Sequence, residues 1–144
     1  TLVETLGLSS FTLVGLSLGG RIAIDYARSI GLDAIWDRIH YLGAGLRKRL
    51  RSIEGVTVHD IGSVQGGIVT FTVEGTSPPD VKEAMRMAGI NVSVVTPSSA
   101  RLDMETRGLA GLVRASVHYF NTEDELDRCA EVAAAAAAAS RRGL

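Results

Sequence analysis

Residues 113–128 read VRASVHYFNTEDELDR and contain both a strand pattern and the start of a helix. The first eight residues alternate between two faces, as in a β-strand with one buried side. We expect the buried face to hold Val113, Ala115, Val117 and Tyr119. We expect the opposite face to hold Arg114, Ser116, His118 and Phe120. Thr122 and Glu125 follow as a capping box, which predicts a final helix running to about Arg141.

The residues before this run alternate between helical and extended patterns. Apolar residues spaced by three and four positions predict a helix over residues 33–52. The basic residues expected largely off its apolar stripe are Arg38, Arg47, Lys48 and Arg51.

The remaining patterns complete a small mixed domain. Strands are expected at residues 56–60, 68–74 and 91–95, and helices at 78–88 and, after a loop at 96–103, at 104–112. The expected fold class is α+β, a small and mostly antiparallel sheet covered by helices and preceded by a strand–turn–helix segment.

The composition excludes several classes of protein. The 144-residue chain has 15 basic and 16 acidic residues, and its net charge of −1 provides no basic field for nucleic acid or an anionic membrane. No apolar run approaches the roughly 18 residues that span a bilayer, and no signal peptide is visible, so a cytoplasmic protein is expected. The single cysteine, Cys129, excludes an internal disulfide and a cysteine-based zinc site, and no metal site is expected. Cys129 itself is expected to be a buried, small apolar residue.

The N-terminal region carries a separate signal. Residues 15–19 match G-x-S-x-G, and residues 7–27 resemble the nucleophile elbow of α/β-hydrolases, in which Ser17 would be the nucleophile. Asp103 and His118 follow in the required order, but His118 is expected inside a strand rather than on a loop. A serine hydrolase using Ser17 therefore stays an alternative to a strand–turn–helix whose glycines serve only the turn.

The start of the chain also bears on its organisation. It opens at Thr1 without an initiator methionine, inside a structured pattern, so a fragment is expected. We expect residues 1–20 to form a hydrolase-like strand and turn, and residues 21–144 to form the main domain.

Four stretches across the main domain resemble one family. They are residues 23–39 (AIDYARSIGLDAIWDRI), 67–74 (GIVTFTVE), 89–94 (GINVSV) and 113–128. They resemble the C-terminal small domain of class V aminotransferases, the fold type I pyridoxal-phosphate enzymes that include cysteine desulfurases. The resemblance implies a homodimeric parent enzyme that acts on an amino-acid substrate and binds pyridoxal phosphate in a large domain preceding this segment.

The resemblance also implies roles for particular residues. The cofactor lysine belongs to the large domain, and Lys48 and Lys82 read as solvated charges, so no cofactor is expected on this chain, which should be inactive alone. Arg114 matches the arginine that clamps the substrate α-carboxylate, a task that suits the planar guanidinium fork. The alternative for Arg114 is a structural pair with an acid such as Asp103 or Glu105.

The loop at residues 95–102 (VTPSSARL) lies where the resemblance places the mobile nucleophilic cysteine of cysteine desulfurases. Ser98 falls at or next to that position, and serine cannot form the persulfide because the thiolate is both nucleophile and sulfur carrier. An aminotransferase, lyase or epimerase therefore fits better than a desulfurase. Ser98, Ser99 and Arg101 are expected to line the substrate entrance. A non-catalytic association domain with an exposed helix face is a further alternative.

Overall fold

The chain divides into two compact units, Thr1–Ile35 and Trp36–Leu144, and the computed structural model describes residues 24–26 and 28–142. In the first unit, residues 24–26 and 28–30 are helical, and Gly31 follows with a φ of 100°. Glycine adopts this left-handed conformation without a steric penalty, so Gly31 separates these helical residues from the helix that follows. Ser17 and the hydrolase-like segment at residues 1–20 lie outside the described residues.

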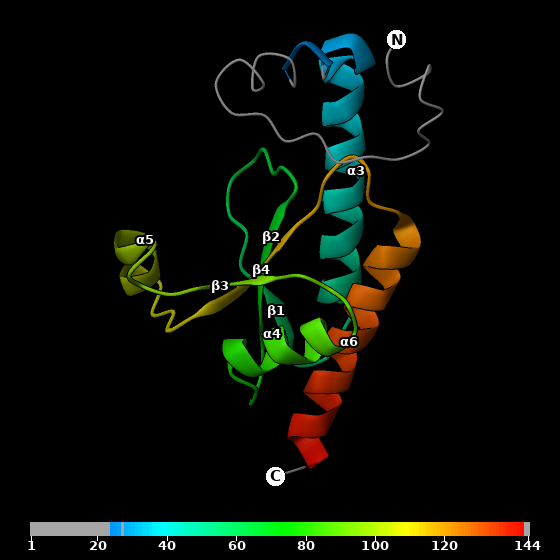
Figure 1. Cartoon of the computed structure of the whole chain (residues 1–144). Helices are drawn as coiled ribbons and strands as arrows, with labels where there is room; N and C mark the ends of the chain where they lie inside the picture. The colour runs from blue at the N-terminus through cyan, green and yellow to red at the C-terminus, as the bar shows by residue number, and fades with distance from the viewer. Residues whose placement is uncertain (1–23, 27, 143–144) are drawn as a thin grey trace. The chain divides into compact units, whose positions relative to one another are not determined.

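A four-stranded antiparallel sheet lies at the centre of the second unit (Figure 1). Across it the strands follow the order β1 (Val56–Val58), β2 (Ile68–Val73), β4 (Leu112–Ser116) and β3 (Ser93–Val95). Thr70 on β2 and Ser93 on β3 are the direct neighbours of Arg114 on β4. Directly opposed residues of antiparallel strands point to the same face, so these three polar side chains form one row.

Three helices pack on the other face of the sheet. They are α3 (Leu32–Arg51), α4 (Pro78–Met87) and α6 (Glu123–Arg142). Ion pairs from Arg38 to Glu123 and from Arg49 to Asp127 join α3 to α6. The buried residues of this core include Leu42, Leu46, Leu50, Val69, Phe71, Val81, Met85, Val113, Ala115, Leu126, Cys129 and Ala133. The predicted α+β class, with a small antiparallel sheet flanked by helices, is confirmed.

The region around residues 113–128 follows its sequence pattern closely. Val113, Ala115 and Val117 are buried, whereas Arg114, Ser116 and His118 are exposed. The capping box is present, because the Thr122 N–H donates to Glu125 Oε2 at 2.9 Å and the Glu125 N–H donates to Thr122 Oγ1 at 3.3 Å. The predicted strand face and helix start are therefore confirmed.

The predicted end of this strand is wrong. β4 ends at Ser116, and residues 119–120 form a turn instead of continuing to Phe120 in extended form. The His118 N–H donates to Asn121 Oδ1 at 2.7 Å, so the asparagine side chain takes the place of a ladder partner. His118 thus lies after the strand, and its expected position inside the strand is corrected.

The boundaries of the short helix are also corrected. α5 (Arg101–Thr106) begins within the predicted loop at residues 96–103 and ends well before residue 112. Gly108, with a φ of 64°, terminates it, and the Leu109 N–H donates to the Met104 carbonyl at 2.8 Å. This is the Schellman pattern, which stops a helix by turning the chain through a left-handed residue. Leu112 is therefore free to enter β4.

A third correction concerns α3, where Arg47 does not lie off the buried stripe but is only 3% exposed. No helix in the described part of the chain is both long and apolar enough to cross a membrane.

Candidate functional site

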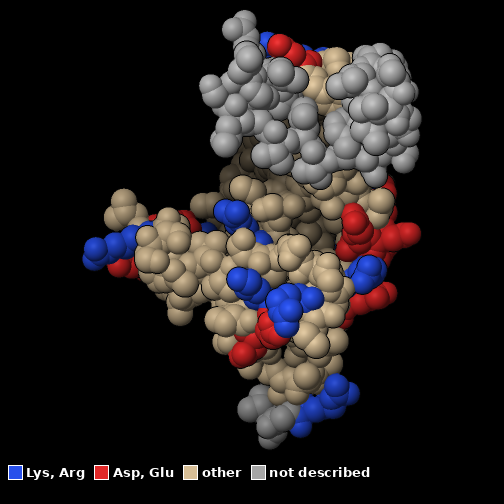
Figure 2. Space-filling view, viewed as in Figure 1, with Lys and Arg blue, Asp and Glu red and all other residues tan. Residues whose placement is uncertain are grey.

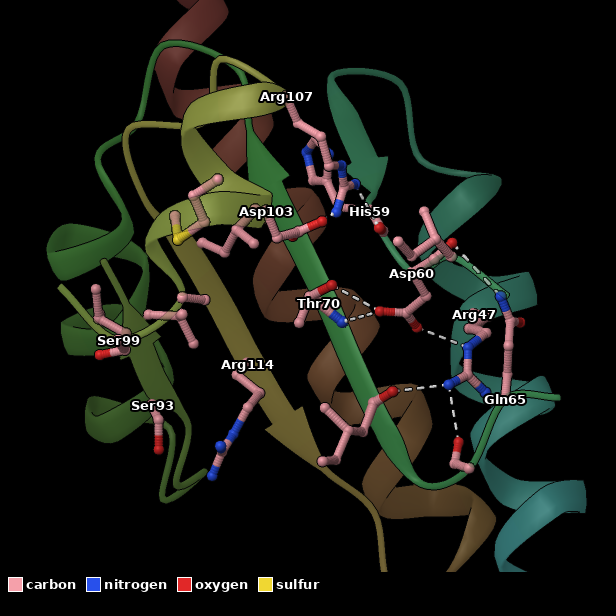
Figure 3. A pocket seen from close by; sticks show the side chains of 18 of the residues that line it. Arg47, His59, Asp60, Gln65, Thr70, Ser93, Ser99, Asp103, Arg107 and Arg114 are labelled. Carbon is pink, nitrogen blue, oxygen red and sulfur yellow. Dashed lines mark hydrogen bonds and ion pairs between the residues drawn. The ribbon is translucent and has the colours of Figure 1, made fainter. Parts of the chain in front are cut away.

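The polar row on the sheet lies in a pocket of about 680 Å³ (Figure 3). Thr70 and Arg114 come from the two central strands, and Ser93 comes from the edge strand β3. His59, just after β1, extends the row because its N–H donates to the Thr70 carbonyl at 2.8 Å. Further walls come from the loop that follows β1 and from the region of α5, namely Ser99, Ala100, Asp103, Met104 and Arg107.

Arg114 is the one pocket cation whose guanidinium has no partner within the described residues (Figure 3). The acids proposed as structural partners are engaged elsewhere. Asp103 accepts from Arg107 at 3.0 Å, and Glu105 accepts from Arg101 at 2.8 Å. An exposed guanidinium in mid-strand, with its five donors available, can bind a carboxylate through two parallel hydrogen bonds.

One wall of the pocket is fixed by a buried ion pair. Arg47 Nε donates to Asp60 Oδ2 at 2.7 Å, and Arg47 Nη2 donates to the carbonyls of Gly66 and Ile68. The second oxygen of Asp60 accepts the backbone N–H and the hydroxyl of Thr70, at 2.7 and 2.6 Å. The loop can approach α3 this closely because residue 43 is a glycine. A Cβ at this position would lie only 2.8 Å from the Gly66 carbonyl oxygen.

His59 brings a titratable group to the same pocket. Its Nε2 lies 2.8 Å from the hydroxyl of Thr72, and its carbonyl accepts from Arg107 Nη2 at 2.6 Å. Burial lowers the pKa of the His59 imidazole, and the charge of Arg107 lowers it further, against a smaller opposing effect of Asp60. The ring is therefore mostly neutral at pH 7 and can both donate and accept a hydrogen bond.

The predicted entrance residues divide into two groups. Ser99 lines the pocket. Ser98 and Arg101 do not line it. The Ser98 hydroxyl lies 2.8 Å from the hydroxyl of Thr96, and the Arg101 side chain is 78% exposed and pairs with Glu105. Of the expected substrate residues, Arg114 and Ser99 therefore lie together.

Four pocket residues were missed from the sequence. The alternation of residues 56–60 could have placed His59 on the face opposite Val56 and Val58, the buried and partly buried valines of β1. Arg47, Asp60 and Arg107 carry no comparable signal, because Arg47 and Asp60 are 13 residues apart in the chain and Arg107 is 48 residues from the His59 carbonyl.

The two lysines lie outside this site. Lys48 on α3 and Lys82 on α4 are exposed, and neither lines the pocket. A pyridoxal-phosphate enzyme needs a lysine to hold the cofactor, so the residues present do not fit that group by themselves. No group of three potential metal-ligating side chains occurs among the described residues.

A comparison with family models assigns the chain to a group of proteins. The model of the aminotransferase class-V family matches residues 12–129. The chain belongs to this family. The expected resemblance to class V aminotransferases is confirmed at the level of the family, whereas the hydrolase-like segment receives no support.

Curated relatives of the chain are named as probable cysteine desulfurases. It is 29% identical over 111 residues to a probable cysteine desulfurase from Xylella fastidiosa, covering 77% of the chain and 26% of that protein. It is 31% identical over 119 residues to one from Halalkalibacterium halodurans, covering 83% of the chain and 29% of that protein. The chain thus spans less than a third of the length of these relatives.

Solved structures agree with this assignment. The apo cysteine desulfurase from Thermococcus onnurineus matches with a TM-score of 0.77 and 28% identity, over 88% of this chain and 30% of that one. A cysteine desulfurase from Escherichia coli matches with a TM-score of 0.70 over 90% of this chain and 32% of that one. At 19% identity, the second likeness shows the fold alone.

Proposed function

We propose that this chain is the substrate-binding small domain of a pyridoxal-phosphate-dependent class V enzyme that acts on an amino acid. In this proposal Arg114 holds the substrate α-carboxylate. The observation that carries it is the guanidinium of Arg114, which has no partner among residues 24–26 and 28–142, in a pocket whose other arginines, Arg47 and Arg107, are bound to acids. A carboxylate entering the pocket would therefore find one available cation.

The cofactor would be held by a large domain of the same enzyme. This part of the proposal rests on Lys48 and Lys82, which are both exposed. Neither is positioned like a lysine that binds the cofactor ring. A homodimeric parent enzyme is part of the same proposal, and the isolated chain would be inactive. Ser99, beside Arg114 in the pocket lining, would contact the bound substrate.

We favour transamination, elimination or epimerisation over desulfuration. A desulfurase needs a thiolate at the substrate, and the loop before α5 carries Ser98 and Ser99 instead. The only thiol, Cys129, is 5% exposed, and burial raises its pKa to about 11. The relatives named as probable cysteine desulfurases thus share the family with this chain without fixing its reaction.

Carboxylate binding can be tested on the chain itself by NMR. The Nε–H signals of the arginines are followed while propionate is added, with propionamide as an uncharged ligand of the same shape. We expect the Arg114 signal to shift with propionate only, and Arg114→Lys to bind about tenfold more weakly because the bidentate fork is lost. Arg86→Lys, on the exposed face of α4, is the matched control. Equal shifts with both ligands, or unchanged affinity in Arg114→Lys, would contradict the proposal.

A further inference from the structure

α5 is held in place by very few contacts. It has six residues, too few for a helix to be stable by itself, and its N-cap Ala100 makes no side-chain capping bond. Met104 is its only fully buried side chain. In Figure 1 α5 lies away from α3 and α6, and charged side chains of both signs gather at its position in Figure 2. Its placement over the pocket therefore needs a specific anchor.

Arg107 provides that anchor. It is the C-cap residue of α5, and its guanidinium bonds both to the helix itself and to a group outside it. Nη2 donates to the His59 carbonyl at 2.6 Å, and Nη1 donates to Asp103 at 3.0 Å. The first bond ties the end of α5 to the end of β1, and the second holds the guanidinium against α5 itself. Arg101, at the other end of α5, pairs only with Glu105 of the same helix.

The contact spans the pocket from one wall to the other. Ser99, Asp103 and Met104 form the wall at α5, and the loop that begins at His59 forms the facing wall, which the Arg47–Asp60 pair holds rigid. A change in the bond between Arg107 and His59 must therefore move the first wall relative to Arg114.

We propose that Arg107 is a positioning residue that fixes the α5 wall and thereby sets the size of the carboxylate ligand admitted beside Arg114. The first part stands on the geometry alone, and the second rests on the proposed function. Arg107 itself touches no substrate in this scheme, because its Nη1 and Nη2 are bound to Asp103 and to the His59 carbonyl.

Amide hydrogen exchange of the whole chain tests the anchor. We expect the amides of α5 to exchange about tenfold faster or more in Arg107→Ala, while those of β2 and β4 stay unchanged. Arg107→Lys keeps the charge but cannot make both bonds, so it should also accelerate exchange at α5. Arg101→Ala, the matched control, should leave α5 within about twofold of the native chain. Native-like exchange in both Arg107 variants, or equal acceleration in Arg101→Ala, would overturn the proposal.

The imidazole of His59 supplies a second readout that general loosening would not produce. Because the charge of Arg107 contributes to the low pKa of His59, Arg107→Ala should raise that pKa toward its ordinary value. Arg107→Lys should keep the pKa low when titrated by NMR. An identical His59 titration in the native chain and in Arg107→Ala would show that Arg107 does not hold this position.

Ligand size tests the second part of the proposal. The affinity of 3-phenylpropionate relative to that of propionate should rise severalfold in Arg107→Ala and stay native in Arg101→Ala. An unchanged ratio would refute the size-setting role. If neither carboxylate bound the native chain, the proposed function would fail, while hydrogen exchange and the His59 titration would still decide whether Arg107 anchors α5.

Discussion

Arg47 on α3 and Asp60 after β1 form a buried ion pair, with Nε and Oδ2 2.7 Å apart and side chains only 3% and 8% exposed. Both charges are further satisfied, by the carbonyls of Gly66 and Ile68 and by the N–H and hydroxyl of Thr70. Burying a charge is costly unless such partners replace its water. The pair thus makes the loop after β1 a fixed wall of the pocket.

Replacing Arg47 should destabilise the chain strongly. Arg47→Ala leaves the Asp60 carboxylate buried without its counter-charge, and such losses cost about 3–5 kcal/mol of unfolding free energy. Urea unfolding followed by circular dichroism measures this. Arg86→Ala removes an exposed pair on α4 and should change stability by about 0.5 kcal/mol or less. Similar losses in the two variants would mean that the buried pair is not a special anchor.

The isolated chain should form no stoichiometric Schiff base with pyridoxal phosphate. Lys48 and Lys82 are exposed and lie outside the pocket, so nothing orients either amine toward the cofactor. Borohydride reduction followed by peptide mass spectrometry should find only low, unselective labelling at both lysines. Complete labelling of one lysine, lost when that lysine is replaced by Arg, would contradict this expectation.

The chain should have negligible activity on small activated esters. Asp103 is bound to Arg107, and His118 donates its backbone N–H to Asn121 in the turn after β4. Neither contact serves the acid–histidine pairing that a serine nucleophile needs. Hydrolysis of p-nitrophenyl acetate should therefore be the same in the native chain and in Ser17→Ala. Turnover that disappears in Ser17→Ala, in a chain that remains folded, would instead support the alternative function of a serine hydrolase.

Local patterns in the sequence predicted those features whose causes are local. The capping box at Thr122 and the alternation around Arg114 depend on residues a few positions apart, so both could be predicted. The turn after Ser116 was missed because the Asn121 side chain accepts a backbone hydrogen bond that would otherwise belong to the strand ladder. The strand propensity of residues 117–120 does not reveal this competing bond.

The site was predictable only where one side chain suffices. Arg114 follows from its strand and from the family resemblance, without knowledge of any partner. Arg47 and Arg107 depend on partners in distant segments, Asp60 and the His59 carbonyl, which only the folded chain brings within hydrogen-bond distance. When such a partner is not known, a charged residue on a helix is expected to be exposed to solvent.

The stability of the chain should depend on the titration of His59. Its pKa in the folded chain lies below the ordinary value, so the unfolded chain binds more protons at this residue. The contribution of neutral His59 is complete above about pH 6.5 and is lost as the pH falls toward the folded pKa. His59→Gln, which cannot titrate, should therefore lose less stability than the native chain between pH 6.5 and 5.5. Parallel pH profiles of the two chains would contradict the low pKa.

Cys129 should be almost inert in the folded chain. It is 5% exposed in the core between α6 and the sheet, and burial raises its pKa to about 11. Compared with a free thiol, this shift alone lowers the thiolate fraction at pH 8 by roughly 100-fold, and the thiolate is the species that attacks disulfide reagents. Reaction with dithionitrobenzoate should accordingly be at least about 100-fold slower in native buffer than in urea.

A control for this measurement is a thiol at the place where a desulfurase would need one. Ser98 is exposed in the loop before α5, so the double variant Ser98→Cys, Cys129→Ala should react at nearly the rate of an unfolded thiol. Rapid, stoichiometric reaction of Cys129 in the native chain would show that its thiol is accessible after all. Burial of the thiol would then no longer disfavour desulfuration, since a reactive thiolate would be present on this domain.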